Sequence, residues 1–213
     1  MKRSKTKKRK NSNQTGGTFG FGGAYTSVMS KIFDVLMLGV LWVICSLPLF
    51  TVGASCSALY YAIVRSVKED KGYASKMFFR SFRQNLKQGI ILWLIIAGLV
   101  CLMGFNFNVL EEHTSGNIGL VMMGVYAAIG VYLILTACYL FPALSRYEMG
   151  VLWLLRISLY MTARYFFTTI MIAVIVIGGS AIVWRIPLMI FIVPGPAAFL
   201  VSEFMERVLA KHM

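Results

Sequence analysis

Apolar runs long enough to cross a lipid bilayer constrain the fold of this chain more than any other feature. A helix needs about 20 apolar residues to span the hydrocarbon core of a membrane. Hydrophobic residues make up 58% of the 213 residues and charged residues only 14%, so lipid must cover much of the apolar surface. We therefore predict an all-α, polytopic transmembrane helix bundle. The predicted spans are residues 28–47, 89–107, 118–141, 166–184 and 186–201.

A further apolar run, 52–67, is shorter than a typical span, and its length fits either a tilted crossing or a re-entrant helix. Basic segments favour the cytoplasmic side of a membrane. Six spans place every strongly basic segment inside and leave 106–117, which has no Lys or Arg, outside. Both termini are then cytoplasmic. Five spans are the alternative, if 52–67 does not cross.

Residues 1–24 differ from the rest of the chain. Seven of the 21 Lys and Arg residues lie in 1–10, and 11–24 is rich in Gly, Ser, Thr and Asn. We expect 1–24 to be a basic, flexible cytoplasmic head and linker. Residues 25–213 are expected to form a single transmembrane helical domain in the cell membrane.

Another seven Lys and Arg residues lie between Arg65 and Lys87, where a helix is predicted over 73–88. Four of them recur at helical spacing and share one face: Lys76, Arg80, Arg83 and Lys87. Phe78, Phe82 and Leu86 form a second face, centred about 120° away. Such a pair of faces suits an interface, with the rings at the acyl boundary and the cations against anionic headgroups or a cytoplasmic partner. The simpler interpretation, which we favour from the sequence, is a basic cytoplasmic loop that only fixes topology.

The linker 143–165 is also basic and is expected to face the cytoplasm. Arg146, Arg156 and Arg164 lie in it, opposed only by Glu148. Arg156 and Arg164 are separated by two helical steps of four, which predicts a second interfacial helix.

Two sequence blocks resemble a known family. The first extends from Leu47 to Ile95, and its matching residues are Pro48, Thr51, Gly53, Ala54, Ser55, Ala58, Tyr60, Tyr61, Gly72, Phe79, Phe82, Asn85 and Trp93. The second block matches at Phe141, Pro142, Ser145 and Arg146. Together they resemble the YesL family of small integral membrane proteins of Gram-positive bacteria. The resemblance implies no assigned activity and an association with carbohydrate-uptake systems.

The sequence contains no catalytic motif of the hydrolase, zinc-peptidase or nucleotide-binding kinds. Its two histidines, His113 and His212, are far from the four cysteines. We therefore expect no enzymatic activity, no metal and no cofactor. Cys45 and Cys56 flank the turn after the first span almost symmetrically, which makes a disulfide conceivable. The alternative is that all cysteines are small apolar residues in helices.

Pro194, Gly195 and Pro196 interrupt the last apolar run and form a candidate helix break. Broken helices line substrate sites in some transporters, whereas a packing kink is the simpler explanation. The best-supported function is an accessory or regulatory membrane protein, and the alternative is a permease or channel for a neutral solute. Expected partners are anionic inner-leaflet lipids and a sugar-transporter subunit or sensor protein, not nucleic acid.

Overall fold

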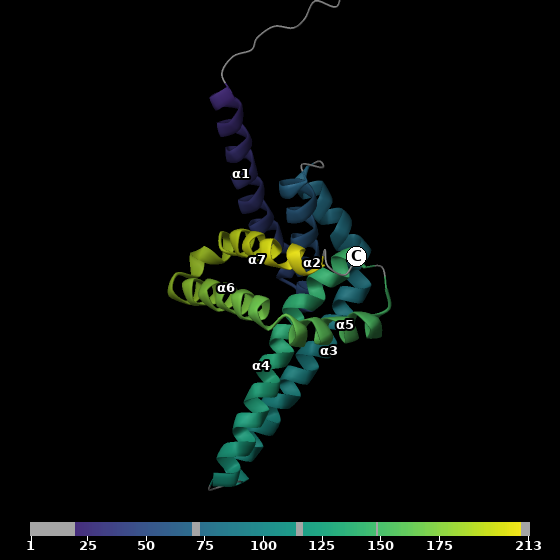
Figure 1. The fold of residues 1–213 in the computed structure, drawn as a ribbon, viewed down its shortest axis with the longest axis vertical. Helices are drawn as coiled ribbons and strands as arrows, with labels where there is room; N and C mark the ends of the chain where they lie inside the picture. Colours follow the sequence, from purple (N-terminus) through teal and green to yellow (C-terminus); the bar gives the residue numbers. More distant parts are fainter. Residues whose placement is uncertain (1–19, 70–72, 114–116, 148, 210–213) are drawn as a thin grey trace, which may run out of the picture.

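The computed structural model describes residues 20–69, 73–113, 117–147 and 149–209, and within these ranges the chain is helical without strands (Figure 1). This confirms the all-α prediction. Residues 1–19, most of the predicted basic head, lie outside the described part. The elements are α1 (Gly20–Ser46), η1 (Leu49–Thr51), α2 (Val52–Ala62), η2 (Ile63–Lys68), α3 (Ala74–His113), α4 (Asn117–Arg146), α5 (Val151–Arg164), α6 (Phe166–Arg185), η3 (Pro187–Phe191) and α7 (Pro194–Leu209).

Among the described residues, four helices are long and apolar enough to cross a membrane: Val28–Ser46, Ala74–Val109, Val121–Arg146 and Phe166–Arg185. The run 52–67 forms α2 and η2, and 186–201 is divided between η3 and α7. The six-span count is therefore not confirmed. Figure 1 shows α1 and the α3–α4 hairpin projecting in opposite directions, with α6 and α7 lying across the long axis.

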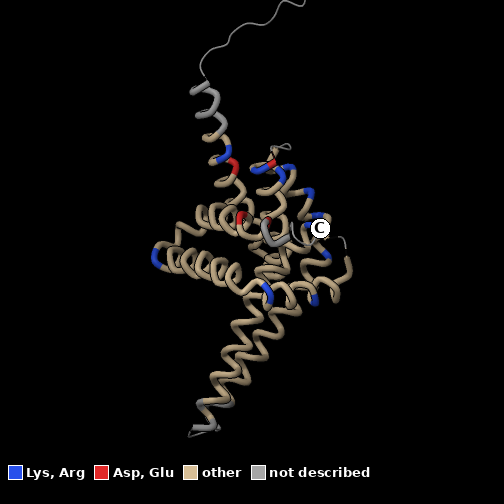
Figure 2. Tube along the Cα trace, viewed as in Figure 1, with Lys and Arg blue, Asp and Glu red and all other residues tan. Residues whose placement is uncertain are grey.

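Charge is unevenly distributed over this arrangement. The sequence has no charged residue in 88–110 or in 117–145, which form the projecting part of the α3–α4 hairpin. Figure 2 shows Lys and Arg concentrated on the N-terminal half of α3 and on α5. The hairpin thus has the composition of a membrane-embedded element, and the N-terminal half of α3 has that of a membrane-surface element.

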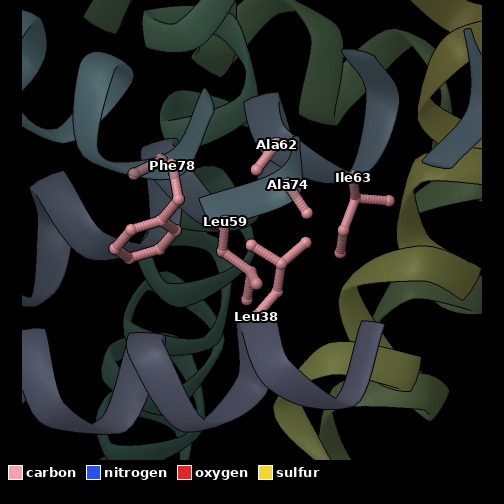
Figure 3. Close-up of a cluster of buried hydrophobic side chains, with 7 residues drawn as sticks. Leu38, Leu59, Ala62, Ile63, Ala74 and Phe78 are labelled. Atoms are coloured by element: carbon pink, nitrogen blue, oxygen red, sulfur yellow. The ribbon is translucent and has the colours of Figure 1, made fainter. Parts of the chain in front are cut away.

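The short helix α2 is the centre of the fold and contacts α1, α3, α4 and α7. A helix that is apolar or small on all sides is expected to be buried. Eight of its eleven residues are buried: Gly53, Ala54, Ser55, Ser57, Ala58, Leu59, Tyr60 and Ala62. Leu59, Ala62 and Ile63 meet Leu38 of α1 and Phe78 of α3 in one core cluster (Figure 3).

Helix α3 is a single helix of 40 residues, so the predicted boundary between an interfacial helix and a span near Gly89 is wrong. A buried stripe continues across that point and holds both halves against the same core. Its residues are Ala74, Phe78, Ser81, Gly89, Leu92 and Ile96. At its other end α3 reaches His113, so most of the polar segment expected as an outer loop is helical.

Helix α4 continues through Pro142 to Arg146, although we expected Pro142 to end it. Proline removes one backbone hydrogen bond from a helix interior and usually kinks or breaks the helix. Here the surrounding residues Phe141, Ala143 and Leu144 are buried, and this packing holds the last turn in place. Ser145 Oγ donates a hydrogen bond to the Pro142 carbonyl at 2.7 Å.

Glycines allow close helix crossings at two places. A Cβ on Gly53 of α2 would lie 2.5 Å from the Gly89 carbonyl oxygen of α3. Gly195 of α7 approaches the Val35 carbonyl of α1 closely, beside Gly39. Small residues at such crossings let helix backbones touch, as is common among membrane helices.

Candidate functional site

The basic face of α3, defined as Lys76, Arg80, Arg83 and Lys87, is exposed. At 100° per residue it lies about 180° from the buried stripe of α3. The expected aromatic face is mostly core: Phe78 is fully buried, and Phe82 stacks on it with ring centroids 6.2 Å apart. The expectation of a ring at the acyl boundary is wrong for Phe78, which is fully buried, whereas Phe82 is half-buried against the same core.

None of the four cations on the basic face of α3 forms an ion pair with another described residue, in contrast to cations nearby. Arg65 pairs with Glu69 at 3.0 Å, and Lys68 pairs with Glu203 at 2.9 Å. The buried stripe on the opposite side of α3 packs against the core and holds the helix in place. The basic face is therefore a rigid, exposed row of cations available to an anionic surface.

Helix α5 carries the other predicted basic residues. Leu154, Ser158 and Met161 are buried on one side of it, while Arg156 and Arg164 are exposed. Arg164 Nη1 donates a hydrogen bond to the Tyr160 hydroxyl at 3.0 Å. This agrees with the predicted amphipathic helix.

Arg146 has a different environment from the other predicted contact residues. Its guanidinium donates to Glu206 Oε2 of α7, and the Tyr60 hydroxyl of α2 donates to Glu206 Oε1 at 2.8 Å. The carboxylate of Glu206 thus joins α2, α4 and α7.

The phenol of Tyr60 is the donor in this network at neutral pH. Burial and then the adjacent Glu206 carboxylate raise the pKa of Tyr60 above its ordinary value. The folded state therefore holds this proton more tightly than the unfolded chain. The hydrogen bond contributes fully below the ordinary phenol pKa of about 10, and its contribution declines only at more alkaline pH. A cavity of about 360 Å³ adjoins it, lined in part by Arg65, Arg146 and Tyr147.

Tyr60→Phe is expected to lower the free energy of unfolding by about 1.5 kcal/mol, because it leaves one Glu206 oxygen without its donor. Unfolding in mixed micelles followed by circular dichroism would measure the loss. Tyr61→Phe is the matched control, since the half-exposed Tyr61 contributes its ring to Arg65 and phenylalanine keeps that ring. Equal losses in the two variants would contradict a specific role for the Tyr60 hydroxyl.

The residues that carry the family resemblance occupy packing positions around α2. Thr51 Oγ1 donates to the carbonyls of Cys45 and Pro48, both at 2.7 Å, and so closes the turn between α1 and α2. Asn85 Nδ2 of α3 lies 3.2 Å from Ser57 Oγ and from Ser81 Oγ. Among the others, Gly53 lies against Gly89, and Ala54, Ser55 and Ala58 are fully buried. Phe141 lies beside Trp93, Pro142 is buried, and Phe79 is exposed.

An apolar groove of about 840 Å³ lies between α1, α2, α4, α6 and α7. Trp42, Cys56, Ile172 and Pro194 are among its lining residues. Cys45 and Cys56 are free thiols, so the conceivable disulfide is not formed; Trp42 Nε1 donates to Cys56 Sγ at 3.3 Å.

Pro194, Gly195 and Pro196 form the first turn of α7, directly after η3. Proline is well accommodated in a first helical turn, where backbone donors have no intrahelical partner. The structure therefore places the predicted break between two helices and not inside one. Within the described ranges, no three His, Cys, Asp or Glu side chains gather as a metal site would require.

Comparison with known proteins finds a family match for one part of the chain. A family described as "Protein of unknown function, DUF624" matches residues 35–107, about a third of the sequence. The match contains the first resembling block and stops before the second. No curated protein and no solved structure matches the chain. The apolar helices and this uncharacterised family fit an integral membrane protein.

Proposed function

We propose that this protein is a non-enzymatic accessory or regulatory component of the cell membrane, and that the basic face of α3 is its docking surface for a membrane partner. The observation that carries the proposal is the row of exposed cations on Lys76, Arg80, Arg83 and Lys87, none of which is paired with another residue in the described part of the chain. Such a row attracts an acidic partner surface and fixes its register. The same helix continues into an apolar hairpin, so the surface is held at the membrane.

The nature of the partner comes from the resemblance to the YesL family, whose members accompany carbohydrate-uptake systems. We propose a subunit of such a transporter, or its sensor protein, as the partner. Positive charge on the N-terminal half of α3 and on α5 supports a cytoplasmic location for this surface.

Arg80→Glu combined with Arg83→Glu is expected to abolish co-purification of the partner from gently solubilised native membranes. Reversal of two charges replaces attraction by repulsion, and the exposed positions leave the core unchanged. Arg80→Lys with Arg83→Lys keeps both charges and should retain the partner. Undiminished co-purification with the doubly reversed variant would contradict docking through this face, and would leave anionic lipid as its remaining target.

The alternative, a permease for a neutral solute, receives less support from the geometry. The Pro194 turn does line a groove, but the groove offers few hydrogen-bonding groups to replace the hydration of a polar solute. Pro194→Ala tests this alternative in proteoliposomes. A solute flux that this substitution reduces would favour the permease over the accessory role.

A further inference from the structure

The apolar groove has the size and lining of a ligand site. Its volume of about 840 Å³ falls within the range of roughly 300–1,000 Å³ that small-molecule sites occupy. Its walls come mainly from helices that are apolar enough to cross a membrane. On the α6 and η3 side the groove is open, since Val176 and Ile190 are 43% and 38% exposed. In a bilayer, the molecules that reach such an opening are lipids.

One end of the groove is marked by a tryptophan and a cation. Trp184 lines the groove and is 88% exposed, and Pro187 lines it three residues later. Between them is Arg185, which is exposed and forms no ion pair with another described residue. Exposed tryptophan beside arginine is typical of the membrane–water interface, where lipid phosphates lie. Figure 2 shows the tip formed by α6 and η3 far from the basic half of α3.

The combination fits one chemical class of ligand. An apolar groove accepts an acyl chain, and the guanidinium of Arg185, which follows the lining residue Trp184 in the chain, can donate charge-assisted hydrogen bonds to a phosphate. An apolar partner helix would fill the groove but would offer no anionic group to Arg185. A free phosphate would use the charge but leave the groove empty.

We infer that this groove is a phospholipid site, in which an acyl chain lies along α6 and the anionic headgroup meets Arg185. The site is separate from the basic face of α3. The outcome of a lipid-binding test therefore does not depend on whether the proposed docking function is correct. This assignment also gives a ligand-binding role to the apolar lining around Cys56 and Ile172.

Native mass spectrometry of the purified full-length protein tests the inference with dioleoylphosphatidylglycerol and dioleoylphosphatidylcholine as probes. Both lipids have a phosphate, but the choline cation of the second offsets its attraction to Arg185, so the anionic lipid is expected to bind about tenfold more tightly. Arg185→Ala should remove this preference, whereas Arg65→Ala, an exposed arginine that does not line the groove, should keep it. Equal affinity of the wild-type protein for the two lipids, or equal effects of the two arginine variants, would overturn the headgroup assignment.

The acyl-chain contact is tested separately by filling the groove. Val176→Trp introduces an indole into the groove and should weaken both lipids at least tenfold. Val174→Trp is the matched control, because Val174 is exposed on the same helix and does not line the groove. The inference is contradicted if the two tryptophan variants bind lipid alike, or if glycerol 3-phosphate alone binds as tightly as the lipid. Arg185→Ala changes only an exposed side chain and keeps the test decisive if Val176→Trp does not fold.

Discussion

Glu206→Ala is expected to lower the free energy of unfolding by about 3 kcal/mol, the lower end for breaking a buried ion pair. The Glu206 carboxylate accepts from Arg146 and from Tyr60, and the side chains of the ion pair are only 19% and 27% exposed. Removal of the carboxylate takes away the acceptor that the largely buried Arg146 guanidinium and the buried Tyr60 phenol share. Three helices lose their common contact at once.

Titration with sodium dodecyl sulfate in mixed micelles would measure this loss. Glu203→Ala is the matched control on the same helix, since Glu203 is 53% exposed and pairs with Lys68. An ion pair exposed to this degree contributes at most about 1 kcal/mol. A loss with Glu206→Ala that is no larger than that of Glu203→Ala would show that the network does not hold α2, α4 and α7 together.

Gly53→Ala is expected to destabilise the protein by about 3 kcal/mol, toward the upper end for overpacking a core. The new methyl group would lie 2.5 Å from the Gly89 carbonyl oxygen and 2.8 Å from Phe141 Cε1. The nearer neighbour is backbone, so α2 and α3 must separate to make room. For that reason Phe141→Leu should not rescue the variant.

Gly98→Ala serves as the comparison for Gly53→Ala under the same unfolding conditions. Gly98 is exposed on α3, and a Cβ there meets nothing within 4 Å. Alanine favours a helix over glycine by up to about 1 kcal/mol, so this variant should be unchanged or slightly more stable. Similar behaviour of the two alanine variants would contradict a tight α2–α3 crossing.

Features with a strong periodic signal could be predicted from the sequence. Apolar length identified the all-α class, and a spacing of three and four residues identified the basic face of α3. The segment 46–88 contains α2 and the basic half of α3. Its small residues between Gly53 and Ala62 now have a physical explanation, because they let α2 occupy the centre of the fold.

Features that depend on tertiary contacts could not be predicted in the same way. The charge change near Gly89 indicated an element boundary, yet one buried stripe continues across it. Pro142 indicated a helix end, and packing of its neighbours overrides that signal. The pairing of Tyr60 and Arg146 with Glu206 joins residues far apart in the chain, so it cannot be predicted from residue spacing within one helix. The groove likewise exists only once α6 and α7 lie against α2.

Cross-linking mass spectrometry in native membranes tests the central claim most directly. Lys76 and Lys87 both lie on the basic face of α3 and present amines to an amine-reactive cross-linker. Docking through this face predicts peptides in which Lys76 or Lys87 is joined to a carbohydrate-transporter subunit or its sensor protein. These cross-links should disappear in the variant with Arg80→Glu and Arg83→Glu. Links from both lysines only to this chain itself, in a sample where other membrane complexes are cross-linked normally, would contradict the accessory role.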